Sequence, residues 1–253
     1  MAEFVWLRKG DKLPAVAAAQ ALLNRTGASL TVDGDYGRRT KAAVAAFQNS
    51  RSLSDDGVIG RNTWPRLVVH ERMKIVDCID VFDPDLYTSE RRFLTNVGGQ
   101  PITIGGMSNG IEQVVQDIIG RHSNIYLLRF HGHGAPGIAG VSDGHDGPPS
   151  RSSFQNDTPT RNALRKLRGK FGPFGSIQFM HCETGRGRNG AQFLQMVADT
   201  VGVPATGGVN DQYASTLRET LRYEGPTRSI CPGGTSLSAW GRGRPALPGM
   251  TVA

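Results

Sequence analysis

The feature that most constrains the fold is a short motif that occurs twice near the N-terminus. Residues 33–40 read D-G-D-Y-G-R-R-T and residues 56–63 read D-G-V-I-G-R-N-T, so both copies share the pattern D-G-x-x-G-R-x-T. An Asp-Gly pair is typical of a tight turn, the second glycine tolerates a positive φ angle, and the threonine lies at or near the start of a helix. Each copy therefore predicts a turn that leads into a helix.

Apolar spacing predicts three short helices around these turns. An early helix is expected over residues 15–24, with its apolar side chains directed inward at Val16, Ala19, Leu22 and Leu23. After the first turn Val44 and Phe47 share one helical face, and the second turn leads into residues 64–69. Three short helices joined by Asp-Gly turns predict a small three-helix bundle.

This segment resembles the peptidoglycan-binding domain found on cell-wall hydrolases. The resemblance covers roughly residues 6–70 and holds at both turns and at Leu7, Gln20, Phe47, Gln48, Thr63 and Trp64. The chain departs from the family at residues 12–14, where a second glycine is usual. The resemblance implies docking onto wall glycan or stem peptide, or onto a protein partner in domains that have lost wall binding. The expected exposed wall contacts are Asp35, Tyr36, Asn62 and Trp64.

From Met73 onward, apolar strand-like runs alternate with helical patterns. Strands are expected over 73–82, 124–130, 176–180 and 203–206, and helices over 111–119, 160–168 and 191–200. This alternation predicts an α/β domain with a mainly parallel sheet. We expect a late hairpin over 219–231 and a tail over 241–253 that is extended or bound to a partner. The predicted domains are a helical bundle over 1–72 and an α/β domain over 73–253.

Reactive side chains follow two of the expected strands. His131-Gly132-His133-Gly134 comes after one strand, and His181-Cys182 comes after another. In an open α/β sheet, reactive groups gather at the carboxyl ends of the strands. If these two strands are parallel neighbours, His133 and Cys182 lie side by side, and a thiol becomes a good nucleophile beside such a base. The backbone amides of Gly134 and Cys182 would then form an oxyanion hole.

The arrangement resembles the caspase-like cysteine peptidases, which include metacaspases, legumains, gingipains and the bacterial CHAT domains. Their pattern is a strand ending in (S/G)-H-G and a later strand ending in Cys, and C-E-T-G at 182–185 matches the CHAT form. The resemblance covers roughly residues 73–225. It implies Cys182 as nucleophile and His133 as general base, with His131 as the rival base. His181 stands where a small residue is usual, and it would tune the thiolate or pack.

The same resemblance implies hydrolysis of a protein or peptide substrate. No cofactor is required, although some peptidases of this kind use calcium. These peptidases mostly read the residue before the cleaved bond with a charged pocket. Asp211 and Asp80 are the candidates for lining that pocket, and an acidic pocket favours arginine or lysine.

Two other interpretations remain open from the residues alone. His131, His133, His181 and Cys182 supply enough nitrogen and sulfur for a zinc ion, but their spacing is not that of usual zinc ligands. The second alternative is a non-catalytic caspase-fold scaffold, which attaches through the N-terminal module to peptidoglycan or to a protein assembly.

Composition narrows the classes of partner. The 253 residues carry a net charge of +7, which suits a polyanion, yet no recognition-helix pattern or aromatic–basic platform indicates nucleic acid. No apolar stretch reaches the roughly 18 to 20 residues of a membrane span. The start of the chain lacks a secretory signal, so we expect synthesis in the cytoplasm and delivery to the wall by lysis, by a secretion machine, or in a bacterial or phage injection particle. Three cysteines cannot all pair, so a free thiol is expected.

Overall fold

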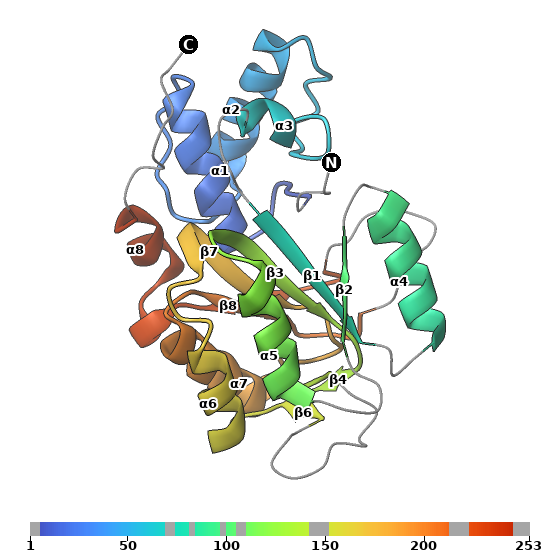
Figure 1. Ribbon diagram of the computed structural model, residues 1–253. Coiled ribbons are helices and arrows are strands. Elements are labelled where there is room, and N and C mark those ends of the chain that lie inside the picture. The colour runs from blue at the N-terminus through green and yellow to red at the C-terminus, as the bar shows by residue number, and fades with distance from the viewer. Residues whose placement is uncertain are drawn as a thin grey trace.

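A computed structural model describes residues 6–68, 74–80, 84–96, 100–104, 110–141, 152–212 and 223–244 (Figure 1). The helices are α1 Pro14–Arg25, α2 Arg38–Ser50, α3 Trp64–Leu67, α4 Pro84–Asn96, α5 Gly110–Arg121, α6 Thr158–Arg165, α7 Gly187–Val201 and α8 Leu237–Arg242, with a 3-10 turn at Pro232–Gly234. The strands are β1 Lys74–Asp80, β2 Ile102–Ile104, β3 Ile125–His131, β4 Gly134–Ala135, β5 Ile138–Gly140, β6 Ser153–Phe154, β7 Phe171–Phe179, β8 Ala205–Gly208 and β9 Thr227–Ile230. None of the described helices is both long and apolar enough to span a membrane.

The central element is a six-stranded sheet in the order β2-β1-β3-β7-β8-β9. Every neighbouring pair is parallel except β8 and β9, which are antiparallel. The described part of the chain therefore confirms a helical segment followed by α/β structure with a mostly parallel sheet. A smaller antiparallel sheet, β4-β5-β6, lies beyond the end of β3.

Two hydrophobic cores cover different parts of the sheet. Helices α5, α6 and α7 pack on one face, where the stacked rings of Phe130 and Phe179 meet Phe193. The second core joins the helical bundle and α8 to strand residues near the beginnings of β3 and β7. Trp64 meets Tyr126 there, with ring centroids 6.2 Å apart. The bundle thus lies at the opposite end of the sheet from β4 and β6 (Figure 1).

Two buried glutamines explain the repeated motif in the bundle. Gln20 of α1 donates to the Asp33 carboxylate at 2.8 Å and accepts from the Gly34 amide at 2.9 Å. Gln48 of α2 repeats these contacts at the second turn, with the Asp56 carboxylate, the Gly57 amide and the Val58 carbonyl. Each Asp-Gly turn is therefore held by a glutamine from the preceding helix, which satisfies polar groups that would otherwise be buried without partners.

One expectation needs correction, and others fall partly outside the described residues. The expected hairpin over 219–231 stays a prediction, because residues 213–222 lie outside the description; the described strand of this segment, β9, pairs with β8. Helix α8 occupies the start of the segment expected as an extended tail, and residues 245–253 lie outside the description. The linker expected at 70–73 also lies outside it, so the boundary at 72 stays a prediction. The sequence patterns did not predict α4, β2 or the small sheet.

We expect Gln20→Ala to lower the free energy of unfolding by about 2–4 kcal/mol, because it leaves several buried polar groups of the first turn without a partner. Gln113→Ala is the control, because Gln113 is exposed and bonds only Asp117 on the same helix. Chemical denaturation of both variants measures the difference. Equal stability of the two would contradict the role assigned to Gln20.

Candidate active site

The site is built where β3 and β7 end side by side. Phe130 lies opposite Phe179 in this parallel pair, and the Met180 amide donates to the Phe130 carbonyl at 2.8 Å. Just beyond, a Cβ atom placed on Gly134 would lie 2.6 Å from the Cβ of His181 and 2.9 Å from the carbonyl oxygen of Cys182. Only glycine allows so close an approach. The segments that carry His133 and Cys182 are therefore in direct contact.

Cys182 is the most accessible of the three thiols. It is half-buried, whereas Cys78 and Cys231 are buried. Burial raises the pKa of Cys78 well above its ordinary value and that of Cys231 to about 11. The amide of Gln212 donates to the Cys182 sulfur at 3.3 Å. Cys182 is therefore the cysteine whose thiol a substrate can reach.

Two backbone hydrogen bonds hold the turn that follows Cys182. Glu183 has a φ of 52°, a left-handed conformation that is uncommon outside glycine. Its amide donates to the Asn210 carbonyl at 3.0 Å, and the Gly185 amide donates to the Gly208 carbonyl at 2.8 Å. The turn is therefore tied to the end of β8, which fixes the position of the sulfur.

The hairpin formed by β4 and β5 closes on the same turn. The Gly137 amide donates to the Thr184 carbonyl at 3.2 Å, and the Thr184 hydroxyl donates to the Ile138 carbonyl at 3.3 Å. At the base of the hairpin, the Gly140 amide donates to the His133 carbonyl at 2.8 Å. The His133 side chain is exposed at this position. Gly134, predicted with Cys182 to supply oxyanion amides, lies between the histidine and the turn.

His131, the rival base, lies in a buried charged cluster. Its Nε2 is 2.9 Å from the Asp77 carboxylate and its Nδ1 is 3.4 Å from Glu90 of α4. Burial lowers the pKa of His131, but Glu90 and Asp77 outweigh burial and raise it to about 9. Burial likewise opposes ionisation of Asp77, yet Arg129, at 2.5 Å, and His131 hold the pKa of Asp77 well below its ordinary value. His131 is therefore protonated inside the protein.

His181 is also buried, but it is neutral. Burial lowers the pKa of His181 to about 3, against the hydrogen bond from its Nε2 to the Gly140 carbonyl at 2.9 Å. Its ring therefore packs beneath the β4–β5 hairpin and carries no charge at neutral pH. Of the three histidines considered from the sequence, only the His133 side chain is exposed.

A cavity of about 540 Å³ lies beside the turn that carries Cys182. Its lining residues are Glu183, Arg186, Val209, Asn210, Asp211, Glu224 and Gly225. Glu183 forms an ion pair with Arg186. Asp211 and Glu224 have no ion-pair partner among the described residues, so the cavity keeps an excess of negative charge. Sequence reasoning selected Asp211 but missed Glu224, because the turn that brings it here is not encoded by periodicity.

Asp80, the other pocket candidate, lies elsewhere. It is 2% exposed at the end of β1, and a Cβ atom placed on Gly132 would lie 3.1 Å from its carboxylate oxygen. The first strand therefore turns this side chain under the Gly132 backbone, away from the cavity beside Glu183. Asp80 does not line that cavity.

Two of the expected wall contacts are buried and need correction. Tyr36 and Trp64 are each 0% exposed. The Tyr36 hydroxyl donates to the Gly57 carbonyl at 3.0 Å and Trp64 packs on Tyr126, so both rings fill the second core. Asn62 is exposed, and Asp35 is partly exposed and pairs with Lys12 at 2.9 Å. These two remain predictions as surface contacts.

The zinc alternative gains no geometric support. Within the described ranges, no group of three or more His, Cys, Asp or Glu side chains is placed to hold a metal ion. His131 and His181 instead bond Asp77 and the Gly140 carbonyl.

The His131 cluster predicts how stability depends on pH. The folded protein keeps the His131 proton up to about pH 9, whereas an unfolded chain releases it near the ordinary value of 6.5. The stability that this proton contributes is full below pH 6.5 and is lost as the pH rises to 9, by up to about 3 kcal/mol. In Glu90→Gln the loss should be smaller, because one carboxylate that raises the pKa is gone.

Chemical denaturation at pH 6.5 and pH 9 measures this difference, with His122→Asn as the control for a histidine outside the cluster. An equal loss of stability in wild type and in Glu90→Gln would show that Glu90 does not hold the His131 proton.

Comparison with known proteins found a matching family for the helical segment. Residues 12–67 match the family model described as "Putative peptidoglycan binding domain". A stretch of 42 residues, 17% of this chain, is 45% identical to the zinc D-Ala-D-Ala carboxypeptidase of Streptomyces albus G and covers 16% of that protein. A stretch of 63 residues, 24% of this chain, is 40% identical to an uncharacterized protein in the bpoA1 3' region of Kitasatospora aureofaciens and covers 53% of it.

Two solved structures are also similar over part of the chain. A peptidoglycan-binding protein from Clostridioides difficile, in complex with glutamine hydroxamate, is 40% identical over 24% of this chain and 39% of that chain, with a TM-score of 0.24. The Burkholderia AP3 phage endolysin is 33% identical over 36% of this chain and 33% of that chain, with a TM-score of 0.26. Each match spans only part of its relative. The family match supports a peptidoglycan-binding domain at residues 12–67.

Proposed function

We propose that this protein is a cell-wall-associated cysteine peptidase of the caspase-like type, with Cys182 as nucleophile and His133 as general base. The contact between the two strand ends through Gly134 is the observation that carries the proposal. It places an exposed histidine and the one half-buried thiol on adjoining segments. The left-handed Glu183 supports it, because uncommon backbone conformations persist mainly where the surrounding structure enforces them, often at active sites.

In the proposed reaction His133 takes the proton from the Cys182 thiol, and the sulfur attacks the carbonyl carbon of the scissile amide. The amides of Gly134 and Cys182 donate to the oxyanion that develops. The carbon–nitrogen bond then breaks, and His133 returns its proton to the leaving amine. Water hydrolyses the thioester, which releases the carboxylate product and the free thiol.

Support for His133 as base also comes from the places of the other two histidines. A base must exchange protons with the thiol near neutral pH. His131 keeps its proton to about pH 9 in its carboxylate cluster, and His181 stays neutral down to about pH 3. Neither histidine has a pKa suited to proton exchange with the thiol near neutral pH, and both side chains are buried.

The acidic cavity beside Cys182 is the proposed pocket for the residue before the cleaved bond. Asp211 and Glu224 supply its negative charge, since Glu183 is paired with Arg186. Asp211 is exposed and Glu224 is half-buried, and two carboxylates without a paired cation favour a cationic side chain. We propose arginine or lysine at that position of a protein or peptide substrate. The proposal needs no cofactor.

The helical domain would deliver this activity to the cell wall. Residues 12–67 match a peptidoglycan-binding family, so peptidoglycan is the proposed partner. The similarity to a wall carboxypeptidase and to an endolysin is consistent with a wall-related role, although it covers only part of each relative. The competing proposal is a non-catalytic scaffold that uses the same domain for docking.

Digestion of a proteome-derived peptide library by wild type and by Cys182→Ala tests the proposal. We expect new peptide termini only with wild type, because the alanine variant lacks the nucleophile. Mass spectrometry identifies the termini, in reactions with and without added calcium. Identical libraries from both proteins in every condition would favour the scaffold.

The same assay tests the pocket. Asp211→Asn with Glu224→Gln should lower kcat/KM for cleavage after arginine or lysine by about 10- to 100-fold, because a charge-assisted contact is lost. Asp55→Asn, an exposed change in the helical domain, is the control and should leave kcat/KM unchanged. Preferred cleavage after aspartate in wild type would refute an acidic pocket.

A further inference from the structure

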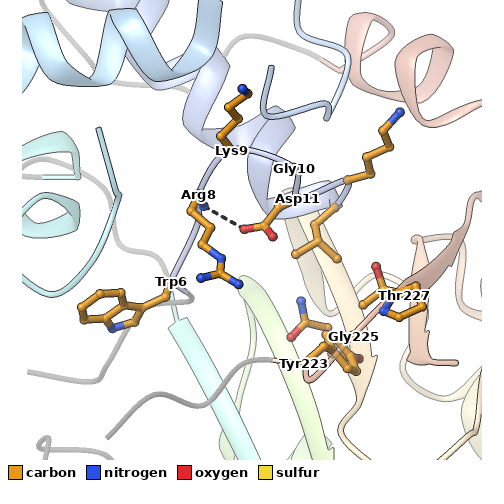
Figure 2. A pocket seen from close by; sticks show the side chains of 12 residues that line it. Trp6, Arg8, Lys9, Gly10, Asp11, Tyr223, Gly225 and Thr227 are labelled. Atoms are coloured by element: carbon orange, nitrogen blue, oxygen red, sulfur yellow. Dashed lines mark hydrogen bonds between the residues drawn. The ribbon is translucent and has the colours of Figure 1, made fainter. Parts of the chain in front are cut away.

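A second cavity, of about 480 Å³, lies between the N-terminal segment and the sheet. Trp6, Arg8 and Asp11 form one wall, and Tyr223 and Thr227 form part of the other (Figure 2). Gln178 of β7 also lines the cavity. Its volume is in the range of small-molecule sites. Gly225 lines both this cavity and the acidic cavity beside Glu183, whereas Cys182, His133, Asp211 and Glu224 do not line this one. The cavity lies at the junction between the helical segment and the α/β structure.

Gln178 is the unusual residue of this cavity. It lies on β7 and is 2% exposed, yet its Nε2 donor has no hydrogen-bond partner among the described residues. Its neighbours across the sheet are satisfied, because Arg129 bonds Asp77 and Thr206 bonds Ser229. A buried donor without a protein partner is costly, so its position on a cavity wall favours an acceptor bound in the cavity.

Arg8 brings positive charge to the same space. Its side chain extends from the N-terminal segment toward the part of the cavity walled by Tyr223 and Gly225, whereas Lys9 points away (Figure 2). The Arg8 backbone amide donates to the Asp11 carboxylate at 2.8 Å, which fixes the local turn. Lys12 is held by Asp35 at 2.9 Å. Arg8 is therefore the cation best placed for a ligand in the cavity.

We propose that this junction cavity binds the free carboxylate of a peptidoglycan stem peptide, with Arg8 and Gln178 as its donors. An arginine and a glutamine that line one cavity offer the kinds of N–H donor that a carboxylate accepts. The choice of peptidoglycan rests on the proposed function, in which the helical domain serves the cell wall. The ligand would touch both parts of the molecule, and it would bind against the strand that leads to Cys182.

The test uses the full chain as Cys182→Ala, so that no ligand is cleaved. The probe is a disaccharide–tetrapeptide with a free C-terminal carboxylate, and titration calorimetry gives its Kd. Further arms use the tetrapeptide without sugar, the same tetrapeptide with a C-terminal amide, the disaccharide alone, and tetra-L-alanine. We expect binding of both free-acid stem peptides, with a rise in melting temperature, and much weaker binding of the other three.

Three variants, each in the Cys182→Ala background, locate the site. Arg8→Gln and Gln178→Leu should each raise the Kd by about 10- to 100-fold, because each removes a donor to a charged group. Lys9→Gln is the matched control and should change the Kd little. Arg8→Gln alters an exposed side chain, so the test holds even where Gln178→Leu perturbs folding.

Unchanged affinity in Arg8→Gln would overturn the proposal, as would equal binding of the amidated peptide. Equal binding of tetra-L-alanine would overturn the assignment to peptidoglycan. Binding to whole sacculi without any dependence on Arg8 or Gln178 would place wall recognition elsewhere and leave the proposed peptidase intact. Failure of wild type and variants to bind the probe or sacculi would instead refute the wall-directed role itself.

Discussion

The parallel pairing of β3 with β7 is the constraint on which the candidate site depends. It aligns Phe130 with Phe179, so that the next residues of both strands leave the sheet at the same edge. Gly134 can then pack against Cys182, and the hairpin and the turn lock onto each other through Thr184. A sheet order that separated these two strands would leave the histidine and the thiol unrelated.

The two ends of the sheet have different surroundings. The beginnings of β3 and β7 are buried by the helical bundle through Trp64, Tyr126 and Phe174, whereas their carboxyl ends are left for the site. Between the two ends, a row of polar side chains crosses the sheet from Asp77 through Arg129 to Gln178. Because the helical segment shares a core with the α/β part, a ligand held at their junction would act on a single packed body.

Local signals predicted much of this architecture. The Asp-Gly turns, the strand and helix periods, and the glycines around His133 each reflect short-range chemistry, so the sequence indicates them directly. Tyr36 and Trp64 were predicted as exposed contacts because they lie in or beside turn motifs, but both are buried. Their burial depends on the core that the bundle shares with the sheet, which the turn motifs do not reveal. The partners of His131, the pairing of β9 with β8, and the place of Glu224 depend on contacts between distant segments, which periodicity does not encode.

The central claim is that His133 and Cys182 act as a coupled pair, and the alkylation rate of Cys182 tests it most directly. The other two thiols are buried, so the reaction with iodoacetamide reports one site. Rates are measured from pH 5 to 9 in wild type and in His133→Ala, with His122→Asn as a control. The account predicts rapid alkylation near neutral pH in wild type and in the control, and a much slower reaction in His133→Ala. Equally slow alkylation in all three proteins would contradict it.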